Sequence, residues 1–330
     1  MREYKWVSIG CGAIANELAK SGVKLYGVAN RSYDKALAFA NKYGIERVYK
    51  NIDDVYKDRD VDIIYISTPN NTHISFIKDA LSAGKHVLCE KSITLNSKEL
   101  EEAVELVEKN NVVLAEAMTI YHMPLYKELK RRIDNDEFGK LNIIQMNFGS
   151  FKEYDMNNRF FNKNLAGGAM LDIGVYALSF VRYFMSSKPN QILSQVKFAP
   201  SGVDEMASII LKNEEEEMAS VILSIHSKQP KRATISFEKA YIEVYEYPRA
   251  SEAIITYTDD GHKEVIKEGL TSMALEYEVR DMEATVNGDD HMHLDYTIDV
   301  MDMMTSIRDD WGMKYPGRNN IYWVNKWPNK

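Results

Sequence analysis

Cysteine is scarce in this chain: its 330 residues include only two, Cys11 and Cys89. A framework of several disulfides, of the kind that staples small secreted domains, is therefore excluded. Both cysteines fall in stretches that read as strand or turn, and we expect no bridge between them. We interpret them as reduced thiols, which favours a cytoplasmic protein.

An excess of positive charge is also missing. The chain has 41 Lys and Arg against 49 Asp and Glu, a net charge of −8. This balance leaves no excess of positive charge that would attract nucleic acid or an anionic membrane. The apolar runs are short and interrupted, so we expect no transmembrane span, and the first strand begins too early to leave room for a signal peptide. We expect neither a nucleic-acid nor a membrane partner.

What the chain does have is enough ordinary globular sequence for two domains. Its 330 residues, 45% of them hydrophobic, exceed one comfortable hydrophobic core. After about residue 136 the regular alternation of strand-like and helix-like stretches gives way to mostly short strand-like segments. We therefore place a first domain over residues 1–120 and a second over residues 121–330.

Strand-like and helix-like stretches alternate regularly in the first domain, which predicts a doubly wound parallel α/β sheet. Gly22, Gly44 and Gly84 stand just past helix ends, where a left-handed residue is needed. Asn96 and Glu99 read as an N-cap pair. Strands are expected at 5–10, 24–29, 62–67, 86–90 and 112–117, and helices at 13–20, 33–42, 73–83, 96–109 and 124–135.

The second domain is rich in short β-branched or aromatic segments separated by turn signals. This pattern predicts an α+β domain in which helices cover one face of a mostly antiparallel sheet. Strands are expected at 141–149, 192–199, 206–212, 218–226, 232–238, 241–247 and 253–258, and helices at 169–185 and 294–311.

The most specific local signal is an apolar strand that runs straight into a G-x-G-x-x-A turn and a helix. In a dinucleotide-binding turn the first glycine permits the tight bend, the second lets the backbone approach a pyrophosphate, and the last small residue lets helix and strand pack. The alternative is a glycine turn without a ligand, and Cys11 is interpreted as turn filler rather than a reactive thiol. The expected cofactor-binding residues here are Gly10, Cys11, Gly12, Ala13 and Ile14, with Ala15 as the packing residue.

The end of the second strand bears on which dinucleotide binds. An Asp or Glu at this point favours NAD, because it accepts a hydrogen bond from the ribose 2′-hydroxyl. The chain instead reads Asn30-Arg31-Ser32, and an arginine with a hydroxyl suits a 2′-phosphate. We predict that these three residues bind the cofactor and that NADP is preferred over NAD. The alternative is that Arg31 is a solvated charge.

The next two strands of interest end in polar loops at the carboxyl edge of the sheet, where ligands bind in this architecture. We expect Thr68, Pro69 and Asn70 to contact the cofactor, and His73 either to contact it or to cap and pack the following helix. Glu90-Lys91 ends the later strand. A lysine here can stabilise a developing alkoxide, whereas a structural ion pair is the alternative.

A double glycine, Gly167-Gly168, opens the strongest helix of the second domain. Asp172 and Tyr176 are four residues apart, so we expect them on one face of that helix. Near Lys91 they would form a proton-transfer triad in which the phenol is the acid or base. The alternative is a packed tyrosine whose hydroxyl is satisfied by the aspartate.

Together these residues resemble the Gfo/Idh/MocA family of NAD(P)-dependent oxidoreductases, and the similarity runs along nearly the whole chain. Tyr176, where many members have His, is similar to the branch of dimeric dihydrodiol dehydrogenases, NADP-dependent xylose dehydrogenases and glucose–fructose oxidoreductase. The resemblance is carried by Gly10-Cys11-Gly12-Ala13-Ile14-Ala15, Thr68-Pro69-Asn70 with His73, Glu90-Lys91, Glu116-Ala117, the Gly-Gly-Ala-Met-Leu-Asp-Ile-Gly-Val-Tyr segment, Ile307-Arg308, Gly312 and Tyr315-Pro316.

The resemblance implies that Lys91 and Tyr176 are catalytic, with Asp172 beside the substrate. It also implies an N-terminal Rossmann domain, NADP as cofactor with NAD possible, and a homodimer formed through the open face of the second domain's sheet. Two departures stand out. Ser92 replaces the usual proline, removing a fixed φ and easy access to a cis bond. Residues 118–122 differ from the branch's usual pattern, which alters the substrate side of the pocket.

We therefore expect an NADP(H)-dependent oxidoreductase that transfers hydride between nicotinamide and a sugar, polyol, diol or related hydroxy or carbonyl compound. Lys91 and Tyr176 would handle the proton. The alternative is an NAD(P)-binding regulatory protein of the same fold without turnover. The intact set of Lys91, Asp172 and Tyr176 favours the enzyme.

Two other groups of polar residues are present. His291 and His293 beside Asp289 and Asp290 read as solvent-facing residues, so no metal is expected. Arg159 is interpreted either as a contact to substrate or cofactor phosphate or as part of a surface ion pair.

Overall fold

The computed structural model describes residues 3–316, and these divide into two compact units. Unit 1 comprises 3–117, 275–294 and Pro316, and unit 2 comprises 118–274 and 295–315. The first division lies close to the expected boundary at residue 120. Residues 275–294, however, return to unit 1, although the sequence analysis placed them in the second domain.

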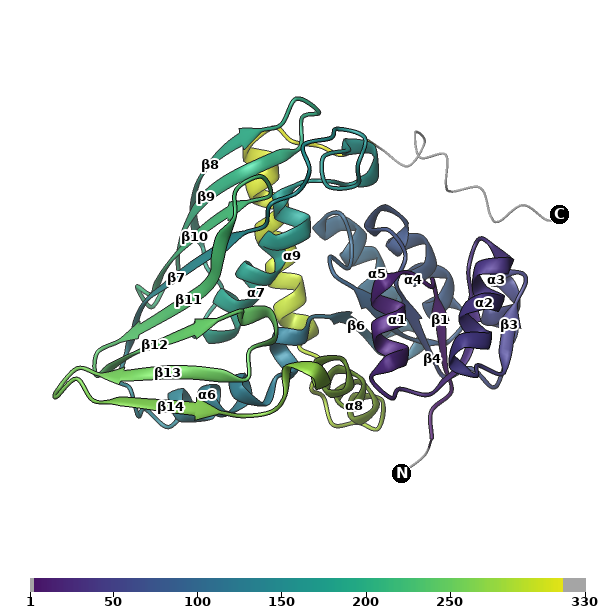
Figure 1. The fold of residues 1–330 in the computed structure, drawn as a ribbon, viewed down its shortest axis with the longest axis horizontal. Helices are drawn as coiled ribbons and strands as arrows, with labels where there is room; N and C mark the ends of the chain where they lie inside the picture. Colours follow the sequence, from purple (N-terminus) through teal and green to yellow (C-terminus); the bar gives the residue numbers. More distant parts are fainter. Residues whose placement is uncertain (1–2, 317–330) are drawn as a thin grey trace. The chain divides into compact units, whose positions relative to one another are not determined.

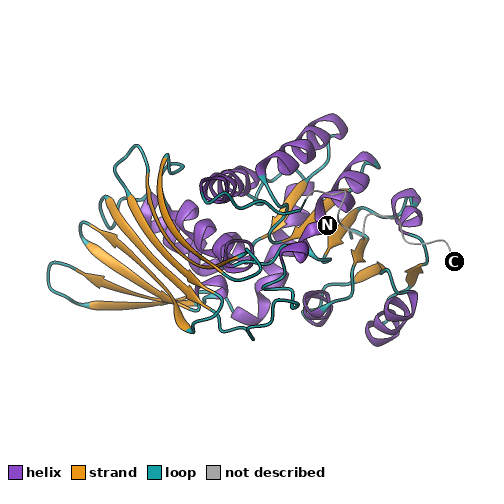
Figure 2. Cartoon of the chain, turned by 90° about the horizontal axis from the view of Figure 1, so that it is seen from above, coloured by secondary structure: helices purple, strands orange, loops and turns teal. Residues whose placement is uncertain are grey.

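Unit 1 is built on the expected doubly wound parallel sheet. Its strand order is β3-β2-β1-β4-β5-β6, and every pair is parallel. Helices lie on both faces of this sheet (Figure 2). The elements are β1 Trp6–Ile9, α1 Ala13–Lys20, β2 Leu25–Ala29, α2 Tyr33–Tyr43, β3 Arg47–Tyr49, α3 Ile52–Lys57, β4 Ile63–Ile66, α4 His73–Ser82, β5 His86–Glu90, α5 Ser97–Asn110 and β6 Leu114–Ala117.

The local signals of unit 1 behave as the sequence indicates. Gly22, Gly44 and Gly84 have φ of +95°, +68° and +73°, which is the left-handed region. The side chain of Asn96 accepts the backbone N–H of Glu99 at 3.0 Å, so the N-cap of α5 is confirmed. The sequence analysis missed β3 and α3, which are too short to carry a clear hydrophobic period.

A further helix that the sequence analysis missed, α8 (Ala274–Val286), completes the core of unit 1. Leu275, Val279 and Met282 join the buried cluster around β1 and α1. The indole N–H of Trp6 also donates to Glu283 at 2.9 Å. This packing explains why residues 275–294, far along the chain, belong to the compact unit built on the first sheet.

Unit 2 contains an eight-stranded sheet whose order is β14-β13-β12-β11-β7-β10-β9-β8. Only the pair of β7 and β10 is parallel, so the expected mostly antiparallel sheet is confirmed. The strands are β7 Leu141–Gly149, β8 Gln191–Phe198, β9 Asp204–Lys212, β10 Met218–Ser224, β11 Gln229–Phe237, β12 Ala240–Tyr245, β13 Glu252–Tyr257 and β14 Lys263–Lys267. The sequence analysis missed β14.

Helices of unit 2 cover one face of this sheet (Figure 1): α6 (Pro124–Asp134), α7 (Val175–Phe184) and α9 (Leu294–Asp310). In the described chain no helix lies over the opposite face. There Leu193 on β8 is 71% exposed and lies opposite Ile210 on β9, which is 46% exposed. The sheet is therefore open-faced, with apolar side chains on the open side.

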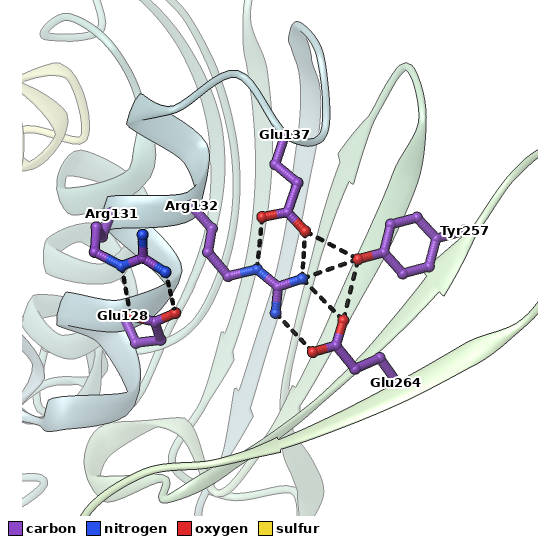
Figure 3. Close-up of polar contacts among 6 residues, drawn as sticks. All are labelled: Glu128, Arg131, Arg132, Glu137, Tyr257 and Glu264. Atoms are coloured by element: carbon purple, nitrogen blue, oxygen red, sulfur yellow. Dashed lines mark hydrogen bonds and ion pairs between the residues drawn. The ribbon is translucent and has the colours of Figure 1, made fainter.

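A polar network ties α6 to the hairpin of β13 and β14 (Figure 3). The buried guanidinium of Arg132 donates to the carboxylates of Glu137 and Glu264, and the Tyr257 hydroxyl lies within hydrogen-bond distance of both carboxylates and shares its one proton between them. These two carboxylates hold the pKa of Arg132 above its usual range. Neighbouring Arg131 pairs with Glu128 at the surface.

One segment of unit 2 contradicts the expectation that no stretch resembles a membrane span. Residues 163–184 are long and apolar enough to cross a bilayer by length and composition. Most of that stretch (78% of its most apolar window) is buried inside the protein, as in the core helix of a soluble fold. Length and composition alone are therefore weak evidence for a membrane.

Candidate functional site

The glycine turn of unit 1 has the geometry that the sequence predicts. Gly10 has φ +108°, and a Cβ there would lie 2.8 Å from Ser67 Oγ and 2.9 Å from Ser67 O. At Gly12 no atom lies within 4 Å of the position a Cβ would take. Ala15 is fully buried. The backbone is thus tightly bent at Gly10, and Ala15 packs in the core. The empty space at Gly12 is where a pyrophosphate could approach the backbone.

The start of α1 suits an anion in its electrostatics as well as its shape. Gly12 is the N-cap, no side chain caps the helix, and its first turn, which begins with Ala13 and Ile14, carries no acidic residue. The first backbone N–H groups of a helix lack intrahelical partners and point at any bound anion. Burial raises the pKa of the Cys11 thiol, which agrees with turn filler rather than a reactive thiolate. These residues fit the phosphates of a dinucleotide.

The segment Asn30-Arg31-Ser32 follows β2 directly, as predicted. The Asn30 amide donates to Ser32 O at 3.1 Å, and Ser32 is the N-cap of α2. Arg31 is exposed. The sequence analysis did not single out Lys35, whose charge acts on the Cys11 thiol and lowers its pKa against the larger effect of burial. The first turn of α2 therefore brings a second cation toward the glycine turn.

The loop after β4 contains the residues proposed to contact the cofactor. Pro69 is exposed, while Thr68 and Asn70 are half-buried. The Thr72 hydroxyl donates to Pro69 O at 2.7 Å and fixes this turn. The loop is thus ordered by its own hydrogen bonds at the carboxyl edge of the sheet.

His73 packs against the backbone of two loops, and its contact with the cofactor stays a prediction. It is completely buried, and its ring nitrogens lie 2.8 Å from Thr68 O and 3.0 Å from Ser92 O. Burial lowers the pKa of His73, and the nearby Lys91 acts in the same direction. Both nitrogens lie within hydrogen-bond distance of backbone carbonyls, and the neutral ring can donate its single N–H to one of them, so His73 packs between the loops that follow β4 and β5.

The backbone after Lys91 is held from two sides. His73 contacts Ser92 O, and the buried carboxylate of Glu116 on β6 accepts the N–H of Ile93 at 2.9 Å. The Lys91–Ser92 peptide bond is cis, although Ser92 lacks the proline ring that eases this geometry. Glu116 was noticed only as part of the family resemblance. Its contact shows that it positions the loop that carries Lys91.

Glu90, the neighbour of Lys91, has a specific buried partner. The hydroxyl of Tyr65 on β4 donates to Glu90 Oε1 at 2.5 Å. Burial raises the pKa of Tyr65 well above its usual value, and the charges on Glu90 and Glu278 add to the effect. Tyr65 therefore stays a neutral donor, and Glu90 is fixed at the end of β5.

The double glycine of unit 2 is required by close contacts. A Cβ at Gly167 would lie 2.6 Å from Phe160 O. Gly168 has φ +127°, and a Cβ there would overlap Asp204 Oδ1. Asp204 is fully buried, and its Oδ2 accepts the N–H of Met170 at 2.5 Å. Burial raises the pKa of Asp204 to about 7. The sequence analysis missed Asp204, because only the tertiary fold brings it under this turn.

Asp172 and Tyr176 do not stand on one regular α-helix. Residues 170–174 form a π-turn with i→i+5 hydrogen bonds, and α7 begins only at Val175. The four-residue stacking expected from α-helical spacing is therefore altered, while both side chains remain half-buried. Single π-turns inside helices occur frequently at functional sites. The irregular turn is a second reason to place a site here.

The ring of Tyr176 lies 6.2 Å from Phe148, measured between ring centroids, and Phe148 also contacts Tyr247. Tyr247 is buried, and its hydroxyl has no hydrogen-bond partner in the described chain. Burial raises the pKa of Tyr247, and a negative charge on Tyr176 would raise it further. Lys91 belongs to unit 1 and Tyr176 to unit 2, so their convergence on one substrate stays a prediction.

Two clusters could suggest a metal ion. His291 pairs with Asp289 at 2.9 Å, and both side chains are well exposed. Asp259, Asp260 and His262 form the one group of three potential ligands in residues 3–316, and all three are exposed. Hydrogen bonds within that turn account for its geometry. Neither cluster carries an inference of metal binding.

Comparisons with known proteins agree with this arrangement. The N-terminal model of an oxidoreductase family with an NAD-binding Rossmann fold (GFO/IDH/MocA) matches residues 4–118, and the C-terminal domain model of the same family matches residues 126–243. The trans-1,2-dihydrobenzene-1,2-diol dehydrogenase of Xenopus laevis is 30% identical over 259 residues, which cover 76% of this chain and 78% of the relative.

Solved structures show the same fold at low identity. A levoglucosan dehydrogenase in complex with NADH superimposes with a TM-score of 0.86 at 17% identity, covering 94% of this chain and 97% of that one. A 3-ketoreductase from Actinomadura kijaniata in complex with NADP gives 0.81 at 19% identity, covering 93% and 98%. With both family models matched in order, the chain belongs to the Gfo/Idh/MocA family and is an NAD(P)-dependent dehydrogenase.

Proposed function

We propose that the protein transfers hydride between NADP(H) and a CH–OH group or carbonyl of a sugar, polyol, diol or related small molecule. The observation that carries this proposal is the construction of the Lys91 loop. Two buried side chains, His73 and Glu116, fix the backbone immediately after Lys91. Buried polar groups are costly unless paired, so this support argues for a lysine whose position matters. The names of the curated relatives support the substrate class.

In the proposed mechanism the bound nicotinamide supplies or accepts the hydride. During oxidation, Tyr176 in its phenolate form would take the proton of the substrate hydroxyl and become a phenol, and the Lys91 ammonium would stabilise the negative charge that develops on the substrate oxygen. During reduction, Tyr176 returns the proton to the carbonyl oxygen. Asp172 orients the substrate by accepting a hydrogen bond from a neighbouring hydroxyl.

The preference for NADP rests on the surroundings of Arg31. A guanidinium binds a phosphate through two parallel hydrogen bonds, and the segment 30–32 contains no carboxylate that would repel one. Lys35 adds positive charge in the first turn of α2, the helix that follows this segment. These features support NADP as the preferred cofactor, with NAD as the weaker one.

We further propose a cytoplasmic homodimer formed through the open face of the unit 2 sheet. Large exposed apolar patches on soluble proteins commonly mark interaction surfaces. Leu193, Ile210 and Ile222 lie on three adjacent strands of that face. A second copy of the same sheet would cover them with an identical surface, as two-fold symmetry allows.

The experiment follows NADPH oxidation at 340 nm with a panel of aldoses, keto-sugars and dicarbonyls, and NADP reduction with D-xylose and trans-1,2-dihydrobenzene-1,2-diol. We expect turnover of at least one compound, and a loss of about 10²–10⁴-fold in kcat for Lys91→Ala and Tyr176→Phe. Lys109→Ala, at the exposed end of α5, and Tyr183→Phe, on α7, are the controls. Tight NADPH binding without turnover, unchanged by these variants, would instead indicate a regulatory protein.

A further inference from the structure

The segment between β7 and the double glycine, residues 150–162, forms a preorganised loop. The Asn158 side chain accepts the N–H groups of Phe160 and Phe161 at 2.9 and 3.2 Å, and its amide donates to Glu153 O at 2.9 Å. Lys152 N donates to Ile225 O at 2.9 Å and anchors the loop to the end of β10. The backbone of this loop is therefore held in a defined conformation.

Two cations of this loop converge on one aromatic ring. The Lys152 ammonium lies 4.3 Å from the centroid of Phe160, and the Arg159 guanidinium lies 4.5 Å from it. Within residues 3–316 neither cation forms an ion pair with a carboxylate, and Glu153 of the same loop is not paired with either. Some other cations of unit 2, such as Arg182 and Lys197, do have carboxylate partners.

Such an arrangement has a physical consequence. Two positive charges near one low-polarity ring repel each other, and the ring's π face offsets only part of that repulsion. A bound oxyanion would relieve it and would gain charge-assisted hydrogen bonds from both cations.

The position of the pair links it to the proposed substrate region. The N–H of Gly168 donates to Phe160 O at 2.9 Å, and a Cβ at Gly167 would lie 2.9 Å from Arg159 O. The loop therefore abuts the double-glycine turn that opens the segment bearing Asp172. Phe151, which is 62% exposed, stacks on His226 at 5.1 Å and adds an aromatic surface to the same loop.

We propose that Lys152 and Arg159, on the Phe160 ring, form an oxyanion subsite that recognises a carboxylate or phosphate carried by the substrate. This inference rests on the proposed function and narrows its substrate class to acidic or phosphorylated sugars and their nucleotide-linked forms. The sequence left two interpretations of Arg159, a contact to a phosphate and a surface ion pair. Arg159 has no ion-pair partner in the described chain, which favours the anion contact.

The subsite can be tested without knowing the substrate. Inorganic pyrophosphate is titrated by equilibrium dialysis into protein saturated with NADP, which occupies the glycine turn of unit 1. We expect one saturable site, weakened at least tenfold by Lys152→Gln and by Arg159→Gln. Lys163→Gln, a charge-matched control from the neighbouring turn, should bind as the wild type does. Melting curves without ligand verify that each variant is folded.

No saturable binding would overturn the inference. So would equal losses in all three variants, because that outcome indicates an adventitious ion only, held by general positive charge. Titrating protein without NADP in parallel distinguishes the two proposals. A chain that fails to bind NADP at all contradicts the proposed function, whereas the effects of Lys152→Gln and Arg159→Gln still decide the subsite.

Kinetics then identify the source of the anion. D-glucuronate, D-glucose 6-phosphate and UDP-glucose are compared with neutral D-glucose and D-xylose. We expect Arg159→Gln to raise KM for the preferred anionic substrate about tenfold or more with little change in kcat, and to leave KM for neutral sugars unchanged. Turnover confined to neutral sugars, with equal KM in variant and wild type, contradicts the subsite while the oxidoreductase proposal stands.

Discussion

Asp204 and Met170 are joined by a buried hydrogen bond, in which the Met170 N–H donates to Asp204 Oδ2 at 2.5 Å. Met170 is the first residue of the π-turn that contains Asp172, and Asp204 comes from the start of β9. The other oxygen of Asp204 is buried against Gly168. A single carboxyl group thus contacts both Gly168, the second residue of the double glycine, and the beginning of the irregular helix.

We predict that Asp204→Asn changes how stability depends on pH. Burial raises the pKa of Asp204 to about 7 from 3.8, so between these pH values the folded protein holds a proton that the unfolded chain has lost. This group's contribution to the free energy of unfolding is therefore present at low pH and falls by about 1.4 kcal/mol per pH unit from about 4 to about 7. Asparagine still accepts the Met170 N–H but does not ionise.

Chemical denaturation at several pH values measures this effect. Between pH 4 and 7 the free energy of unfolding should fall less steeply for the variant than for the wild type. At pH 8 the variant should be the more stable protein. Asp155→Asn, which removes an exposed carboxylate, is the control. Identical slopes for Asp204→Asn and the wild type would contradict the prediction.

Arg31→Ala should weaken NADP selectively. Hydrogen bonds to a charged group contribute about 1.5–3 kcal/mol, so we expect KM for NADP to rise roughly 10–100-fold while KM for NAD changes little. Lys42→Ala, at the far end of α2, should leave both values unchanged. Steady-state kinetics with each dinucleotide measure the two constants. A parallel rise for NAD and NADP would mean that Arg31 does not contact the 2′-phosphate.

Arg132→Met should destabilise unit 2, because it leaves Glu137 and Glu264 close together without their shared cation (Figure 3). Breaking a fully buried pair costs about 3–5 kcal/mol, and partial exposure of both carboxylates reduces our expectation to roughly 2 kcal/mol. The surface pair offers a matched control, since Arg131→Met should cost less than about 1 kcal/mol. Urea denaturation measures both values, and equal losses would refute a special role for Arg132.

Ile210→Glu should dissociate the proposed dimer. The substitution places a charge among apolar side chains of the open sheet face, where a partner sheet would have to desolvate it. Light scattering should give about twice 37.9 kDa for the wild type and about 37.9 kDa for the variant. Leu37→Glu, at an exposed position on α2 of unit 1, is the control. A monomeric wild type would contradict the dimer.

The sequence by itself determined the features that short-range chemistry controls. The Gly10 turn requires a positive φ, the Asn96 side chain competes for the first N–H groups of α5, and the alternation of strands and helices predicts a parallel sheet. Each of these signals is read within a few residues, and each agrees with the structure. The chemistry of Arg31 and Lys91 could also be proposed from residue type and place in the motif.

Only the tertiary structure decided which buried groups support the site. Asp204 lies 34 positions from Met170, and His73, the first residue of α4, contacts Ser92 in the loop after β5. The same holds for α8, which rejoins the first sheet through Val279 and Met282. A local pattern cannot reveal these partners, because a buried polar or apolar group is satisfied by whatever the folded chain brings to it. At the π-turn that contains Asp172, too, the first N–H bonds to a side chain of another strand.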